Sequence, residues 1–317
     1  MDIKISSRDK SLLVLSFLRI MSHSQLLELS AEEWTTRAKK HAALVSPFAD
    51  AFVKRRSVGH SHPVHDFLFT YYSCSPLKLK QWVPSVDESL VVTALMKEEY
   101  PWLNDYWFCS DGDLVSYNKE RLSENTLYQA RFVAELCGNI LQRQPRFGCF
   151  GMHEWAMVYK LSPEEIRHKG HRLRLSSEEI AHFVESQTIC CSHYDAYRFF
   201  TECARPLNIL NPQIEMRLQM EQGGCLHANM DLYKWATKLW PWIGSDFIAK
   251  TFFLSLEGRE LDMRASPYDL TDEGYEPLYI ETEEGRKQYQ KEQQLFAERS
   301  TPLRQELCAF CDRLVNV

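Results

Sequence analysis

Three histidines and an aspartate lie close together in the segment HSHPVHDFLFTYY, which covers residues 60–72. They are His60, His62, His65 and Asp66. Imidazole and carboxylate groups together can bind a transition metal. Alternatively, a carboxylate can fix the tautomer of an imidazole that transfers protons. Hydrogen-bonded packing in the core is a third explanation, and this segment alone does not decide among them.

Three further segments repeat the combination of an imidazole and a carboxylate in an apolar or aromatic setting. They contain His153 and Glu154 (GMHEWAMVY), His193 and Asp195 (CSHYDAYRFF), and His227 and Asp231 (GCLHANMDLYKW). A buried carboxylate is costly unless it is paired or bound to metal. His227 and Asp231 are four residues apart, which places both on one face of a helix. We therefore expect the four segments to converge on one site.

The candidate metal ligands are His62, His65, His153, His193 and His227, with iron, zinc or manganese as the metal. The candidate catalytic carboxylates are Asp66, Glu154, Asp195 and Asp231. The sequence has neither an HExxH motif nor the paired Glu-x-x-His elements of di-iron proteins. The metal hypothesis therefore depends on residue types and not on a known spacing.

Several other mechanisms lack their motifs in this sequence. We find no G-x-S-x-G, no P-loop and no G-x-G-x-x-G. The segment LDMRASPYDL places Arg264 between Asp262 and Asp269. Its guanidinium group either anchors a loop or presents one face to an anionic substrate. We keep Arg264 as a candidate substrate-binding residue.

Composition is that of a globular protein, with 44% hydrophobic and 25% charged residues among 317. The formal net charge of −6 does not favour binding to DNA. Ten cysteines without the spacing of a disulfide framework favour a reducing cytoplasm. An apolar run at residues 11–20 is too short to cross a membrane, and translation could start at Met1 or Met21.

Helical patterns dominate the chain and predict a mainly α fold with at most a few short strands. The clearest helix is expected at residues 226–240, and others at 31–45, 63–72, 87–99 and 124–144, with a further helix that begins at the capping box of residues 176–179. Pro47 and Pro302 are expected to interrupt helices. Strands are expected only at 171–175 and 277–282. We predict an N-terminal extension, 1–28, and a single helical catalytic domain, 29–317.

Five segments together resemble an uncharacterised bacterial family whose members commonly carry the label 3-methyladenine DNA glycosylase. The segments are HPVHDFLFTYY, GCFGMHEWAMVYK, DAYRFFT, GCLHANMDLYKWATKL and LDMRASPYDL. The resemblance implies hydrolysis of an N-glycosidic bond to an extruded base. Glu154 or Asp231 would position the water, and rings such as Trp155, Tyr194 or Trp235 would stack on the base.

Three functions therefore remain as hypotheses. The first is cleavage of an N-glycosidic bond, in DNA or in a smaller compound that contains a nucleobase or another aromatic ring. The second is a metal-dependent oxidase or hydrolase of a small molecule. The third is a ligand-binding protein without catalytic activity, whose histidines are satisfied core residues.

Overall fold

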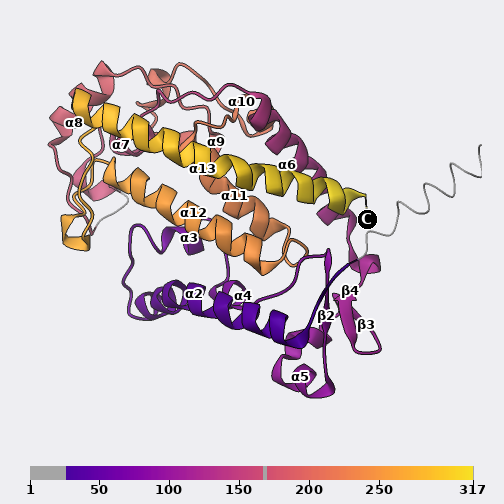
Figure 1. The fold of residues 1–317 in the computed structure, drawn as a ribbon. Coiled ribbons are helices and arrows are strands. Elements are labelled where there is room, and N and C mark those ends of the chain that lie inside the picture. Colours follow the sequence, from indigo (N-terminus) through magenta and orange to yellow (C-terminus); the bar gives the residue numbers. More distant parts are fainter. Residues whose placement is uncertain (1–25, 167–169, 317) are drawn as a thin grey trace, which may run out of the picture.

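Long helices form the frame of the protein in this computed structural model, which describes residues 26–166 and 170–316. The central helices are α6 (Glu124–Gln142), α11 (Leu226–Lys238), α12 (Ser245–Arg264) and α13 (Glu283–Val315). α13 packs against α6 on one side and against α11 and α12 on the other, as Figure 1 shows. The predicted mainly α fold is confirmed.

Both prolines that were expected to interrupt helices lie inside continuous ones. Pro47 is within α2 (Ala31–Ser57), and Pro302 is within α13. An internal proline costs about 3 kcal/mol because it removes a hydrogen bond and crowds the preceding turn. In α2 the buried residues Val45 and Ala49 lie on both sides of Pro47. Tertiary packing of the flanking turns therefore offsets the local cost.

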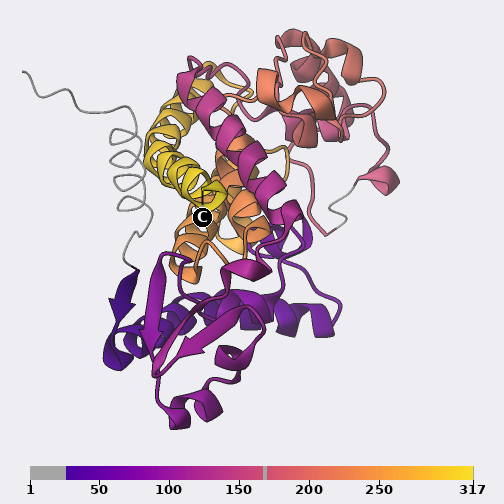
Figure 2. The ribbon, with the colours of Figure 1, turned by 90° about the vertical axis from the view of Figure 1, so that its right-hand side faces the viewer.

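One small sheet lies beside the helices, at the end of the molecule formed by the first third of the described chain (Figure 2). Its strands are β1 (Leu27–Leu29), β2 (Glu88–Val91), β3 (Phe108–Asp111) and β4 (Leu114–Tyr117), in the order β1-β2-β4-β3. β1 pairs parallel to β2, and the other pairs are antiparallel. A separate hydrophobic cluster around Trp34 and Trp82 lies under this sheet.

The predicted strands at 171–175 and 277–282 are wrong. Within the described chain, the first segment contributes only a single bridge between Leu173 and Tyr268, and no strand lies in the second. The backbone of the first segment instead bonds to residues 267 and 269, in the loop after α12, and in the second segment Leu278 N–H donates to the Arg264 carbonyl at the end of α12, at 2.7 Å. The expected helix at 87–99 is also wrong in its first part, because β2 occupies residues 88–91 before α5 (Ala94–Glu99) begins.

Shorter helices connect these elements. They are α3 (Phe67–Thr70), α4 (Pro76–Lys80), α7 (Met152–Val158), α8 (Ser177–Ser186), α9 (Tyr194–Tyr197) and α10 (Arg217–Met220), with 3-10 turns at Pro101–Asn104, Lys119–Arg121, Pro163–Glu165, Arg205–Leu207, Ile214–Met216 and Thr271–Glu273. The helix expected at 63–72 is therefore shorter, because residues before Phe67 form turns. α7, α8 and α9 gather at one end of the central helices (Figure 1).

The N-terminal extension predicted for residues 1–28 lies mostly outside the described residues, as do the apolar run and Met21. Residues 27 and 28 belong to β1 and pair with β2. Among the helices of the described chain, none combines the length and the apolar character needed to cross a membrane.

Candidate metal centre

Three helices bring two histidines and one aspartate together. His153 lies on α7, His227 in the first turn of α11, and Asp262 near the end of α12. One ligand atom from each residue lies within 4.8 Å of the other two. His153 and Asp262 are buried, and His227 is nearly so. Imidazole nitrogens and a carboxylate oxygen suit zinc, iron or manganese.

Close packing of α11 and α12 positions two of the three ligands. Gly258 on α12 faces Met230 on α11, where a Cβ atom would come within 2.7 Å of both Met230 Cγ and Phe296 Cζ. A larger residue at this position would therefore force these side chains, or the helices that carry them, to shift. Asp262 follows Gly258 by one helical turn, and His227 precedes Met230 by about one turn, so the contact brings both ligands to the same region.

His153 reaches the same region from a short helix with a constrained start. Gly151, the N-cap of α7, has φ +70°, in the left-handed region that favours glycine. A Cβ atom at Gly151 would approach the Tyr289 ring of α13 to 3.4 Å. The turn before α7 therefore lies against α13, and the His153 ring stands at 88° to the His227 ring with their centroids 4.2 Å apart.

The two nearest ligand atoms face each other without a hydrogen bond of good geometry. His153 Nε2 lies 3.0 Å from Asp262 Oδ1. Within the described chain, neither of these buried atoms has a hydrogen-bond partner. Buried polar atoms are rarely left so, and such atoms call for an explanation. A cation held between them is one explanation, and an ion pair between the two groups is the other.

Arg259 holds the other oxygen of the aspartate. Its Nη1 donates to Asp262 Oδ2 and to Glu154 Oε1, both at 2.7 Å. These two bonds leave Asp262 Oδ1 directed toward His153. Partners of this kind orient metal ligands in known sites.

The two histidines of the centre differ in their electrostatic surroundings. Burial opposes protonation of His153, but Asp262 and Glu154 outweigh it and raise the pKa of His153 to about 9. Burial and the neighbouring His153 lower the pKa of His227 to about 3. Burial acts against the charged form of Asp262 too, yet the nearby His153 and His227 hold its pKa below the usual value. His227 is thus neutral near pH 7, the form in which an imidazole binds metal.

A cavity of about 410 Å³ opens beside this centre. His227, Glu154 and Arg259 contribute polar groups to its wall, and aromatic rings cover much of the rest: Phe67, Tyr71, Phe199 and Tyr268. Its size is that of a small-molecule site, and its rings suit a flat ligand.

A second buried network lies next to the centre. His193 Nε2 is 3.3 Å from Asp231 Oδ2, and Lys234 Nζ donates to Asp231 at 2.9 Å and to Asp195 at 2.6 Å. Arg217 also donates to Asp195, at 2.6 Å. The His193 and His227 rings are 5.6 Å apart, so the network adjoins the centre. Of its carboxylates, Asp195 lines the cavity.

The opening cluster forms a separate group. His62 and His65 are stacked, with ring centroids 4.1 Å apart, and His62 Nδ1 accepts bonds from the backbone N–H of residues 64 and 65. Asp66 is paired with Arg55 and accepts a bond from the His62 backbone N–H at 2.9 Å. These residues organise the turn before α3, and none belongs to the group that could hold a metal in the described chain.

The remaining candidates do not line the cavity. The Trp155 ring is completely buried in the core, where Nε1 donates to the Ala265 carbonyl at 2.8 Å. Arg264 donates to the Glu276 carbonyl and pairs with Glu292, so it anchors a loop. Tyr194 and Trp235 both lie close to the Arg217 guanidinium, and Trp235 is buried. None of these four residues is part of the cavity wall.

Sequence reasoning did not select Asp262 as a ligand or Arg259 as its partner. Both lie at buried positions of α12, three residues apart. Two opposite charges at this spacing on the apolar face of a helix were the available signal.

Comparison with known proteins assigns this chain to no family. No family model, no curated protein and no solved structure matches the chain. The chemistry of the site is therefore the basis for inferring a function.

Proposed function

We propose that this protein is a metal-dependent hydrolase of a small, flat organic molecule. The observation that carries the proposal is the buried group of His153, His227 and Asp262 beside a cavity of about 410 Å³. Three protein ligands leave coordination positions open for water and substrate, as in catalytic sites. The expected metal is zinc, iron or manganese.

A bound divalent cation would supply Lewis acidity and lower the pKa of a coordinated water. The chain supplies the other functions. Glu154 lines the cavity, and its Oε1 is 3.7 Å from His153 Nε2, so its carboxylate is placed to accept a proton from water. Arg259 keeps both Glu154 and Asp262 oriented. The aromatic rings exclude water from the face of the substrate.

Glu154 is the reason to favour hydrolysis over oxidation. A general base next to the ligands serves a reaction in which water is the nucleophile, whereas oxidation needs a redox-active metal and an oxidant. The same ligands could also bind iron, the metal that an oxidase would need. Activity with zinc as the only metal would exclude the oxidase.

Elemental analysis of protein purified without chelators tests the proposal first. We expect near one equivalent of metal per chain, and loss of most of it in His227→Ala. The matched control is His182→Ala, an exposed histidine on α8, which should keep the metal. A protein that contains no metal and binds none of zinc, iron(II) or manganese(II) when they are added would refute the proposal.

Cleavage of an N-glycosidic bond is the second candidate, and it depends on the family resemblance. The aromatic wall of the cavity and the carboxylates of Glu154 and Asp195 support it, because such a cavity could hold one planar base. Asp231 is 1% exposed and paired with Lys234, so Glu154 is the better candidate for positioning water. Release of free base from alkylated DNA or a nucleoside by metal-free protein, and its loss in Glu154→Gln, would favour this candidate.

A further inference from the structure

A second hollow, separate from the main cavity, has the chemistry of an anion site. It has a volume of about 220 Å³. It lies between α4, the C-terminal end of α11 and the N-terminal end of α12. Its wall contains Lys78, Lys234, Lys238 and several hydroxyl groups, and no acidic side chain belongs to the described wall. This is unusual in a chain whose formal net charge is −6.

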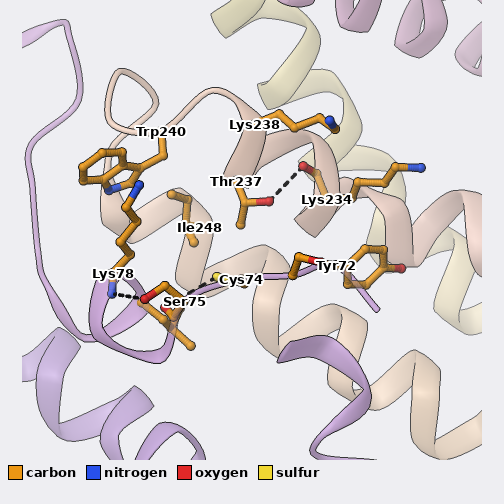
Figure 3. Close-up of a pocket in the computed structure, with 11 residues that line it drawn as sticks. Tyr72, Cys74, Ser75, Lys78, Lys234, Thr237, Lys238, Trp240 and Ile248 are labelled. Atoms are coloured by element: carbon orange, nitrogen blue, oxygen red, sulfur yellow. Dashed lines mark hydrogen bonds between the residues drawn. The ribbon is translucent and has the colours of Figure 1, made fainter. Parts of the chain in front are cut away.

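Two hydrogen-bond donors meet at one end of the hollow. Lys78 Nζ lies 4.3 Å from the centroid of the Trp240 ring. Figure 3 shows the Lys78 side chain extending toward Trp240, with its ammonium group over the indole ring. The buried Nε1–H of Trp240 has no hydrogen-bond acceptor in the described chain. A buried donor without an acceptor calls for an explanation, and an acceptor bound next to the ammonium group is one.

The charges of the three lysines are not equivalent. Lys234 Nζ is bound to Asp195 and Asp231, which offset its charge. Among the ion pairs of the described residues, none involves Lys78 or Lys238. In Figure 3 the side chains of Lys234 and Lys238 extend away from the end at which Lys78 and Trp240 meet. Lys78 is therefore the uncompensated cation at that end.

The geometry points to a site for a small aromatic carboxylate, and we propose that this hollow binds one. A single ammonium group and one indole N–H match a singly charged carboxylate, whereas a doubly charged phosphate would need more cations. The Trp240 ring and the side chains of Leu79 and Ile248 provide an apolar wall for the ring of the ligand. The residues that line this hollow differ from those of the main cavity, so the proposal does not depend on the hydrolase.

Nuclear magnetic resonance of the indole N–H groups tests the site with benzoate as the probe. The Trp240 resonance is assigned as the one lost in Trp240→Phe. We expect benzoate to shift this resonance in a saturable manner. Benzamide has the same shape without the charge. Its affinity should be lower than that of benzoate by about tenfold or more.

Substitutions of lysine residues test whether benzoate binds at Lys78. Lys78→Gln should weaken benzoate binding by about tenfold, because one charge-assisted hydrogen bond is lost. Lys287→Gln, a control on the exposed face of α13, should leave binding unchanged. Lys78 is exposed, so its replacement should leave the spectrum otherwise intact. The proposal is overturned if benzoate produces no saturable shift, if benzamide binds equally well, or if Lys78→Gln binds benzoate like the unsubstituted protein.

Discussion

His153 and Asp262 come from distant parts of the sequence, yet His153 Nε2 lies 3.0 Å from Asp262 Oδ1 in the buried centre. The contact is made by α7 and α12. α12 packs on α11 and α13, and the turn before α7 lies against Tyr289 of α13. The ion pair with His153, one hydrogen bond of Arg259 and the proposed metal site all depend on Asp262. Its removal should therefore affect both stability and metal binding.

Asp262→Asn should lower the free energy of unfolding by about 3 kcal/mol, the lower end of the range for breaking a buried ion pair. The lower end applies because Arg259 keeps its bond to Glu154. Chemical denaturation of the metal-free protein measures the change. Asp312→Asn, an exposed substitution on α13, is the control and should change stability by less than about 0.5 kcal/mol. Equal stabilities of the two variants would contradict the role of Asp262.

Added metal should stabilise the folded protein. A ligand that binds only the folded state adds about 2.7 kcal/mol when its concentration is 100 times the dissociation constant. Thermal unfolding with zinc, and again after a chelator, should show a reversible rise in the melting temperature. His227→Ala should lose this response while His182→Ala keeps it. A rise of the same size in His227→Ala would show that the metal binds elsewhere.

Gly258→Ala should weaken the metal centre without changing a ligand. The added Cβ atom would lie 2.7 Å from Met230 Cγ on α11 and from Phe296 Cζ on α13, so these side chains or the helices that carry them must shift. We expect a loss of about 1–3 kcal/mol in stability and weaker metal binding, measured by denaturation and zinc titration. Gly138→Ala on α6 is the matched control, because a Cβ atom there meets nothing within 4 Å. That control should be neutral or slightly stabilising, and a similar loss in both variants would argue against the packing explanation.

Lowering the pH should reduce the stability of the folded protein, partly through protonation of His41 on α2. This buried ring donates from Nε2 to the Leu79 carbonyl at 2.7 Å, and burial lowers its pKa below 6.5. The unfolded chain takes up a proton near pH 6.5 while the folded chain does not. Stability from this residue is therefore complete above pH 6.5 and is lost as the pH falls below it.

His41→Gln isolates this contribution, because glutamine can keep the hydrogen bond but does not titrate. Unfolding free energies are measured by urea denaturation at pH 7 and pH 5. The variant should lose less stability over this interval than the unsubstituted protein, whereas His60→Gln, at an exposed position, should not differ from it. An unchanged pH dependence in His41→Gln would show that His41 has the same pKa in the folded and the unfolded chain.

Local patterns in the sequence were sufficient for several helices. The capping boxes at Ser30 and Ser176 and the amphipathic pattern of residues 226–240 predicted α2, α8 and α11. Capping and helical periodicity act over neighbouring residues, so they can be recognised without the fold. The same kind of pattern identified His153 and His227 as candidates, since each has a carboxylate nearby in an apolar segment.

Only the tertiary structure decided which candidates meet. Pro47 and Pro302 remain within helices because packing of their neighbours outweighs the local cost. His62 and His65 form their own stacked pair, whereas Asp262, not selected from the sequence, joins His153 and His227. A site shared by three helices depends on how closely they approach, and a contact such as that at Gly258 exists only once the helices pack. The residue types that could bind a metal were thus set by the sequence, and their convergence by long-range packing.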